Sequence, residues 1–400
     1  SYYFMFVILF FVGAYFEDAY KKKELPHFFK ASGVLALAAV VGVCINISNL
    51  YHTYEYSKET MRGKSELKQE GAAASQTSSG LDRDYITNWS YGIGETLTLL
   101  VPNVKGGGSG STMSQSEAAM AKANPMYNGI YSQLPQYFGE QPWTAGPVYV
   151  GAFVMFLFVL GCFIVKGPLK WALLGATIFS ILLSWGKNFM GLTDFFIDYV
   201  PMYNKFRAVS SILVIAEFTI PLLAIFALKE ILSKPDMLKQ EKNCRGVIAA
   251  LVLTAGVALI LAVAPGTFFS SFITAQEMTA LKQALPAEHL APFVANLTEM
   301  REAIIASDAW RSFFIIVIGC LFLFLYQLRK LKASFTLAGI ALLCLIDMWS
   351  VNKRYLNDEQ FVPKSKRSEA FVKTQADEII LQDTTPNYRV LNFIGFPGNT

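Results

Sequence analysis

Long apolar runs alternate with polar segments along most of the chain. Eight of these runs approach the roughly 20 residues that a helix needs to cross the hydrocarbon core of a bilayer. They predict membrane-spanning helices near residues 1–16, 31–50, 147–165, 169–185, 208–228, 246–264, 311–328 and 333–350. The pattern therefore predicts an all-α polytopic membrane protein with a transmembrane domain over residues 1–350.

Hydrophobic residues make up 53% of the 400 residues and charged residues only 16%, whereas an average soluble protein carries about 25% charged residues. This composition excludes a disordered chain, a secreted disulfide scaffold and a nucleic-acid-binding protein. Four of the five cysteines lie in apolar runs without the spacing of metal ligands, and the three histidines are far apart. We therefore expect no disulfide, no zinc site and no nucleic-acid partner.

Lysine and arginine gather in the short connections after the first, third, fifth and seventh predicted spans. Because cytoplasmic loops are enriched in these residues, the four connections are predicted to be cytoplasmic. Their basic residues are Lys21, Lys22, Lys23, Lys30, Lys166, Lys170, Lys229, Lys234, Lys239, Lys242, Arg245, Arg329, Lys330 and Lys332. The alternate segments, residues 51–146, 186–207, 265–310 and 351–400, would then face outward, as would both ends of the chain.

The first predicted outward loop contains a stretch, residues 81–103, that is rich in aromatic, acidic and glycine residues. Its apolar part is too short to span a bilayer and carries Glu95 near its start, which favours a segment that lies in the interface or re-enters the protein. Asp82 and Asp84 form an Asp-x-Asp pair before it. Lys105 begins a Gly-rich run. Such a run can bind a phosphate through its backbone N–H groups, but a flexible loop is the commoner case.

The second outward segment, residues 186–207, carries two acids and two bases close to the expected membrane surface. Asp194 and Asp198 are four residues apart, so on a helix they share one face and can act together on a metal, a cation or a sugar hydroxyl. Lys205 and Arg207 directly precede the fifth span. An arginine there can clamp a lipid phosphate, and the alternative is simple anchoring of the helix end.

One acid, Glu217, is predicted near the middle of the fifth span, four residues before Pro221. An intramembrane carboxylate at that depth is expected to face a partner or a wet cavity, in either a functional or a structural role. Asp347 is expected to anchor the outer end of the last span. Residues 278–285 and 289–305, on either side of Pro286, have the pattern of helices that lie along the outer surface.

The tail after Trp349 becomes polar and predicts the start of an extracytoplasmic domain over residues 351–400. Residues 378–381 have the pattern of a helix end, and residues 388–393 alternate as in a strand, which favours an α/β or β domain. The chain opens inside an apolar run without an initiator methionine. We therefore expect it to be a piece of a longer protein.

Five short stretches resemble the bacterial YfhO family, in the form found in Bacteroidetes. They are WSYGIGET at 89–96, VPN at 101–103, DFF at 194–196, PMYNKFR at 201–207 and YRVL at 388–391. The resemblance implies a core similar to the GT-C class of membrane glycosyltransferases, in the bacterial cytoplasmic membrane, with the large loops and the C-terminal end outside. It implies transfer of a sugar from a polyprenyl-phosphate carrier to an envelope glycan or protein.

The same resemblance implies roles for individual residues. An outward carboxylate would act as base for the acceptor hydroxyl, and basic groups would hold the carrier phosphate as it leaves. The candidate bases are Asp82, Asp84, Asp194 and Asp198, and the candidate substrate-binding residues are Tyr91, Glu95, Lys105, Lys205 and Arg207. GT-C enzymes usually carry the key carboxylate in the loop after their first span, which a piece that begins at a later span would lack. The expected partners are membrane lipid, the lipid-phosphate sugar donor and the acceptor, and a divalent cation is left open as a cofactor.

Two other classes of function remain as alternatives. Glu217 with Pro221 in one helix is also typical of a transporter or flippase of a lipid-linked or polar solute. A non-catalytic envelope assembly protein is compatible with every feature above. Substitutions separate the classes, because a transporter depends on Glu217, whereas a transferase depends on Asp194 or Arg207.

Overall fold

The computed structural model describes residues 3–60, 80–234, 236–366 and 372–384. These residues form helices and connecting segments and contain no β-strand. Contacts divide the chain into two units, Ser1–Val351 and Asn352–Thr400. The division lies one residue beyond the domain boundary drawn from the sequence.

Each of the eight predicted spans contains a helix in the first unit. The helices are α1 (Phe4–Lys22), α2 (Leu25–Ile45), α7 (Ala152–Ile164), α8 (Pro168–Ser184), α10 (Val214–Ser233), α11 (Glu241–Leu251) continued through a π-helical turn by α12 (Val257–Val263), α14 (Ala287–Gln327) and α15 (Ala333–Tyr355). Among the described residues, five helical segments are long and apolar enough to cross a membrane, or six if the bent pair α8 and residues 186–199 counts as one span. The fold is therefore that of a polytopic helical membrane protein, and the count of eight spans stays a prediction.

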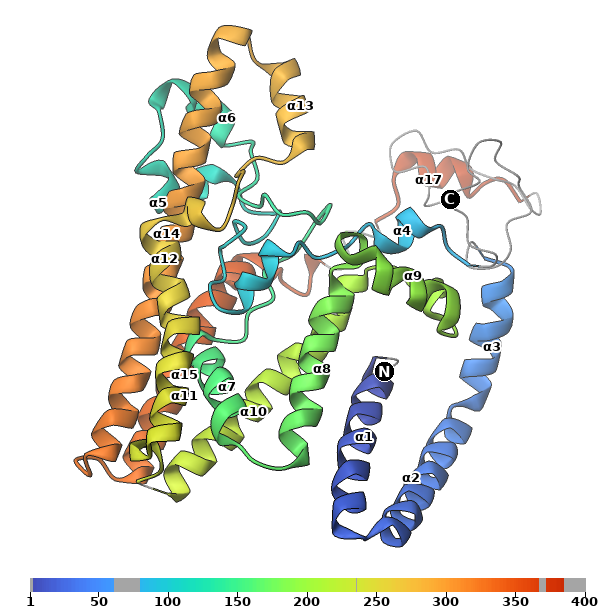
Figure 1. Ribbon diagram of the computed structural model, residues 1–400. Helices are drawn as coiled ribbons and strands as arrows, with labels where there is room; N and C mark the ends of the chain where they lie inside the picture. Colours follow the sequence, from blue (N-terminus) through green and yellow to red (C-terminus); the bar gives the residue numbers. More distant parts are fainter. Residues whose placement is uncertain (1–2, 61–79, 235, 367–371, 385–400) are drawn as a thin grey trace. The chain divides into compact units, whose positions relative to one another are not determined.

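The shorter helices occupy the segments between the spans. They are α3 (Ile47–Lys58), α4 (Arg83–Thr87), α5 (Glu117–Met120), α6 (Asn128–Tyr131), α9 (Met190–Tyr199) and α13 (Ala275–Ala284). Figure 1 shows the connections α1–α2, α7–α8, α10–α11 and α14–α15 at one end of the first unit. We call this the basic-loop end, and the opposite end, where α4, α5, α6, α9 and α13 lie, the large-loop end.

Helix packing separates buried from peripheral spans. Helix α10 packs against α7 and α8, α14 packs against α7 and α12, and α1 packs against α8. None of the residues of α2 is buried, although this helix is strongly apolar. An apolar helix without protein neighbours on most of its surface is suited to face lipid, because lipid tails satisfy its side chains as well as a protein core does.

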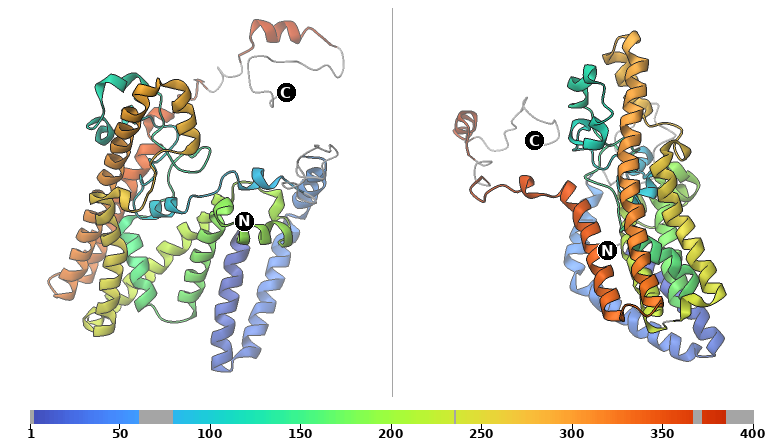
Figure 2. Two further views of the ribbon diagram at one scale, coloured as in Figure 1. Left: turned by 45° about the horizontal axis from the view of Figure 1, so that its top comes forward. Right: turned by 90° about the vertical axis from the view of Figure 1, so that its left-hand side faces the viewer.

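Helix α14 has 41 residues, which at 1.5 Å per residue is about 62 Å and twice the roughly 30 Å of a hydrocarbon core. Its N-terminal half packs with α5, α13 and residues 113–134 around Phe293 and Leu297. Figures 1 and 2 show these segments beside the N-terminal half of α14. The sequence predicted a separate surface helix over 289–305. These residues are helical, as predicted, but the helix does not end before the span, because no glycine or proline interrupts residues 293–318 and it continues as α14.

The second unit is described over a short stretch. Helix α17 (Gln375–Ile380) begins with a capping box in which the Thr374 hydroxyl and the Asp377 carboxylate satisfy each other's backbone N–H groups. The helix ends at Ile380, with Leu381 as its C-cap, which confirms the helix end predicted at 378–381. The strand predicted at 388–393 lies outside the described residues.

Candidate functional site

The segment around Tyr91 crosses the end of α8 at the large-loop end. Helix α8 and residues 186–199 meet at 108°, and the corner is bonded to this segment. The Tyr91 N–H donates to the Ser184 carbonyl at 2.9 Å, and the Lys187 N–H donates to Ser90 Oγ at 2.8 Å. Gly186 has φ +45°, and a Cβ there would lie 2.1 Å from Ser90 Oγ. The corner therefore requires glycine, and it fixes residues 90–92 against the helix bundle.

Glu95 is the most deeply buried acid of this segment, with 1% of its surface exposed. Its carboxylate accepts hydrogen bonds from the Tyr137 hydroxyl and, at 2.7 Å, from the Gly92 N–H. Burial raises the pKa of Glu95, and the two hydrogen bonds oppose the shift. A Cβ at Gly139 would lie 1.8 Å from Glu95 Oε1. Glycine at that position is therefore what lets the carboxylate and the tyrosine meet.

Lys105 lies beside Glu95 without bonding to it. The ammonium lies over the rings of Phe269, at 4.3 Å, and Phe138, at 5.2 Å. Burial lowers the pKa of Lys105, and the carboxylates of Glu95 and Glu140 oppose the shift. In the described part of the chain, no carboxylate lies within ion-pair distance of this ammonium. A buried acid and a partly buried base thus act on each other only through space.

The Gly-rich run after Lys105 is part of this structure. The Gly106 N–H donates to the Asn103 carbonyl at 3.0 Å, and the Ser109 N–H donates to the Thr144 carbonyl at 2.8 Å. A Cβ at Gly106 would overlap the backbone of Gln136. Backbone contacts therefore hold both ends of this run against neighbouring segments, and its flexibility stays a prediction.

Arg207 lies on the same end of the molecule and is exposed. Its guanidinium stacks over the rings of Trp89, at 5.2 Å, and Tyr85, at 5.5 Å, and donates to the Tyr85 hydroxyl at 2.8 Å. Lys205 ends the short turn Tyr203–Lys205 and is partly buried. The two aromatic rings orient the planar face of Arg207, which suits bidentate binding of a phosphate.

Bonded contacts connect Arg207 with Glu95. The Ser210 N–H donates to the carbonyl of Trp89, on which Arg207 stacks, and the Ser210 hydroxyl contacts Gln141 Oε1 at 3.2 Å. The Gln141 N–H donates to the Tyr137 hydroxyl at 2.9 Å, and Tyr137 donates to Glu95. These contacts join Arg207 to Glu95, and the charge of Glu95 acts on Tyr91 and Lys105. We call Tyr91, Glu95, Lys105 and Arg207 the Glu95 site.

The four aspartates predicted as bases lie apart from the Glu95 carboxylate. Asp82 caps α4 by accepting hydrogen bonds from N–H groups of its first turn, and Asp84 is exposed. Asp194 and Asp198 share one face of α9, as their spacing predicted, and both bind Arg83. Sequence reasoning missed Arg83, because more than 100 residues separate it from α9. Among the described residues, no group of three or more His, Cys, Asp or Glu side chains could hold a metal ion.

Glu217 lies in the first turn of α10 and its side chain is exposed. A 3-10 turn, Val209–Leu213, precedes this helix and belongs to the same candidate span, Val209–Ser233, so the expected depth of Glu217 in the membrane stays a prediction. In the described part of the chain no group donates a hydrogen bond to this carboxylate. Its charge acts on the Tyr91 phenol, so it borders the Glu95 site.

Two buried ion pairs were not expected from the sequence. Asp347 is 2% exposed and binds the Tyr149 hydroxyl, at 2.8 Å, and Arg311. It is thus a buried acceptor and not the interfacial anchor that the sequence suggested. Arg301 is fully buried and binds Glu277 at 2.6 and 2.7 Å. The sequence carries one sign of the second pair, because Arg301 lies on the apolar face of the helix predicted over 289–305.

No family model, no curated protein and no solved structure matches this chain. The helices and the Glu95 site define its class as a polytopic helical membrane protein with a buried acid and base at its large-loop end. The functional argument therefore rests on the geometry of the site, and the family resemblance stays a prediction.

Proposed function

We propose that the chain is the membrane part of a glycosyltransferase that moves a sugar from a polyprenyl-phosphate carrier to an envelope glycan or protein, on the outer face of the bacterial cytoplasmic membrane. The observation that carries the proposal is the Glu95 site, in which a buried carboxylate lies beside a cation that does not neutralise it directly. Perturbed acid–base pairs of this kind concentrate at functional sites.

Sugar transfer from a lipid phosphate needs two kinds of group. The acceptor hydroxyl loses its proton to a base as its oxygen bonds to the anomeric carbon, and the bond from that carbon to the phosphate oxygen breaks. The leaving polyprenyl phosphate takes the bonding electrons and is stabilised by cations. No metal or nucleotide is required by this scheme.

The Glu95 site supplies both kinds of group. We assign the base to Glu95, because its raised pKa makes the carboxylate a stronger proton acceptor than an exposed glutamate. We assign the phosphate to Arg207, whose guanidinium is exposed and oriented by two rings, with Lys105 stabilising negative charge that develops near Glu95. Asp194 and Asp198 are less suited as bases, since Arg83 binds both.

Replacing Glu95 by glutamine tests the assignment, because the amide keeps the size of the side chain and one oxygen acceptor but cannot take a proton. We expect sugar transfer to fall by about 10²–10⁴-fold, the usual contribution of a general base. The assay uses detergent-solubilised membranes containing the full chain and a panel of polyprenyl phosphates that carry radiolabelled hexoses or N-acetylhexosamines. Transfer is followed by the label that leaves the lipid fraction.

Two variants serve as controls. Glu288→Gln removes an exposed acid, 81% accessible, at the same end of the molecule and should leave transfer unchanged. Asp194→Asn tests the alternative base. A loss with Asp194→Asn but not with Glu95→Gln would move the base to α9, and absence of transfer from every donor by a folded wild-type chain would reject the proposal.

The transporter alternative drew on Glu217 as a charge inside the bundle. An exposed side chain in the first turn of α10 gives that alternative less support than a buried one would. Glu217→Gln is expected to leave sugar transfer within a few-fold of wild type. A complete loss with this variant, combined with normal activity of Glu95→Gln, would favour transport instead.

A further inference from the structure

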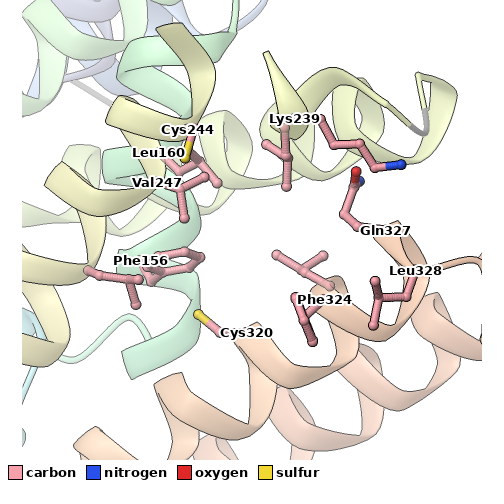
Figure 3. Close-up of a pocket in the computed structure, with 12 residues that line it drawn as sticks. Phe156, Leu160, Lys239, Cys244, Val247, Cys320, Phe324, Gln327 and Leu328 are labelled. Carbon is pink, nitrogen blue, oxygen red and sulfur yellow. The ribbon is translucent and has the colours of Figure 1, made fainter. Parts of the chain in front are cut away.

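A separate cavity lies between α7, α11 and α14 at the basic-loop end. Its volume is about 400 Å³, within the range of small-ligand sites. Apolar side chains form most of its wall, among them Phe156, Leu160, Val247, Cys320, Leu323 and Phe324. Figure 3 shows these side chains around an open interior. None of them belongs to the Glu95 site, which lies at the opposite end of the helices.

One polar side chain in the wall has no partner. Gln327, the last residue of α14, is 8% exposed, and neither its amide nitrogen nor its amide oxygen has a hydrogen bond among the described residues. A buried amide is normally satisfied, because its desolvation otherwise opposes folding. An amide left open in a cavity wall is therefore a sign of a ligand with polar atoms.

The polar side of the cavity is also positively charged. Lys239, in the turn before α11, lines the cavity and lies on the same side as Gln327 in Figure 3. Its ammonium binds Asp236 at 2.8 Å, and the same carboxylate binds Arg329 at 3.0 Å. One carboxylate thus faces two cations, and Lys242 and Lys330 follow close by in sequence. The rim carries a net positive charge.

We propose that this cavity binds a membrane phospholipid with an anionic head group. One acyl chain fills the apolar interior, and the ester and phosphate oxygens lie at the rim, where the Gln327 amide and the Lys239 ammonium donate to them. The order of groups fits a bilayer, because the apolar wall comes from α7, α11 and the last two turns of α14, and the polar rim comes from the end of α14 and the turn before α11. This lipid is distinct from the polyprenyl carrier of the proposed function, and the inference holds if that function is wrong.

Photolabelling of the full chain in nanodiscs tests this inference. The discs contain phosphatidylcholine with a minor fraction of phosphatidylglycerol that carries a diazirine at the end of one acyl chain, and mass spectrometry maps the adducts. We expect adducts to concentrate on the cavity walls of α7, α11 and α14. Excess unlabelled phosphatidylglycerol should lower them at least about tenfold more effectively than phosphatidylcholine does.

Filling the cavity supplies the matched comparison. Leu323→Trp should remove the cavity adducts, whereas Leu321→Trp, at a position 53% exposed on the same helix, should not. Val247→Trp fills the cavity from α11 and replaces the first variant if that one fails to fold. Lys239→Gln should retain the adducts and lower the preference for phosphatidylglycerol, because it removes the cation that lines the cavity.

Two results would overturn the inference. Adducts spread evenly over the lipid-facing helices, without enrichment at the cavity, would mean that no lipid chain enters it. Equal competition by phosphatidylcholine in the wild-type chain would mean that the rim does not recognise an anionic head group. The wild-type competition needs no variant, so the inference stays testable even if every substitution prevents folding.

Discussion

Loss of Glu277 should destabilise the large-loop end more than loss of its partner, Arg301. The arginine is fully buried in the N-terminal half of α14, where it binds both oxygens of Glu277 and donates to the Phe272 carbonyl at 2.7 Å. Its guanidinium also lies 4.8 Å from the centre of the Phe138 ring. The glutamate side chain is 15% exposed and stands in the first turn of α13. Removing Glu277 therefore leaves a buried guanidinium unpaired, whereas removing Arg301 leaves a carboxylate that is partly exposed.

The magnitudes follow from that difference. Glu277→Ala leaves a buried guanidinium without a counter-charge, which costs about 3–5 kcal/mol. Arg301→Met keeps an apolar side chain in the same space and leaves a carboxylate that reaches water. The helix dipole of α13 favours this carboxylate by about 0.3–1 kcal/mol, so the loss is limited to charge-assisted hydrogen bonds, about 1.5–3 kcal/mol. The double variant should resemble Arg301→Met, because the second substitution removes nothing further.

Hydrogen exchange of the peptides covering α13 and residues 287–305 measures this local stability in detergent. Exchange through local opening should be two to four orders of magnitude faster for Glu277→Ala, since each 1.4 kcal/mol is about tenfold. Glu299→Ala, at an exposed position on α14, should change exchange by less than about threefold. If Arg301→Met accelerates exchange as much as Glu277→Ala, buried charge is not what sets the cost, and the reasoning fails.

Three further predictions concern the Glu95 site. Gly139→Ala places a methyl 1.8 Å from Glu95 Oε1 and should lower sugar transfer by about 100-fold, whereas Gly129→Ala, which has open space around it, should be neutral in the same transfer assay. Transfer measured against pH should be bell-shaped. Burial raises the pKa of Glu95, so the midpoint of the acid limb should lie above the usual glutamate pKa of about 4.3. Burial lowers the pKa of Lys105, so the midpoint of the alkaline limb should lie below the usual lysine pKa of about 10.4. Glu95→Gln should remove the acid limb, and an unchanged profile would contradict the role of its carboxylate. Arg207→Lys keeps the charge but loses the stacking, which is worth about 0.5–1 kcal/mol per exposed ring. Steady-state kinetics should therefore show that KM for the lipid donor rises by less than about 30-fold while kcat is retained. A fall in kcat instead would count against phosphate binding by Arg207.

Hydrophobic patterning predicted the helices well, because a membrane span is determined by local composition. All eight apolar runs contain helices, and their basic connections gather at one end of the molecule. Continuity between elements was harder to predict. Residues 306–310 carry Asp308 and a change in polarity that suggests a boundary, yet nothing in that stretch breaks a helix. A change in polarity shows where a helix leaves the apolar layer, but it does not show where the helix ends.

The candidate site could be predicted only in its local parts. The spacing of Asp194 and Asp198 placed them on one face of a helix, because that relation depends on four consecutive residues. Their partner, Arg83, depends on how the chain returns to α9, and no local pattern encodes that contact. Tyr137 was missed for the same reason, since 42 residues separate it from Glu95. Local periodicity gives a face, whereas the partner on that face is a property of the tertiary fold.

The Glu95 site differs from the other buried charges of the molecule in that its acid and its base form no direct ion pair. Buried Arg301 and Asp347 each bind an opposite charge directly, which offsets the desolvation of both ions. Glu95 and Lys105 make no such contact, although a direct ion pair between them would offset the effect of burial on both pKa values. Proteins depart from their own packing rules mainly where function requires it. An acid held ready to accept a proton and a cation held ready to meet a new negative charge would lose both properties if they bound each other, so their separation supports the proposed roles of Glu95 and Lys105.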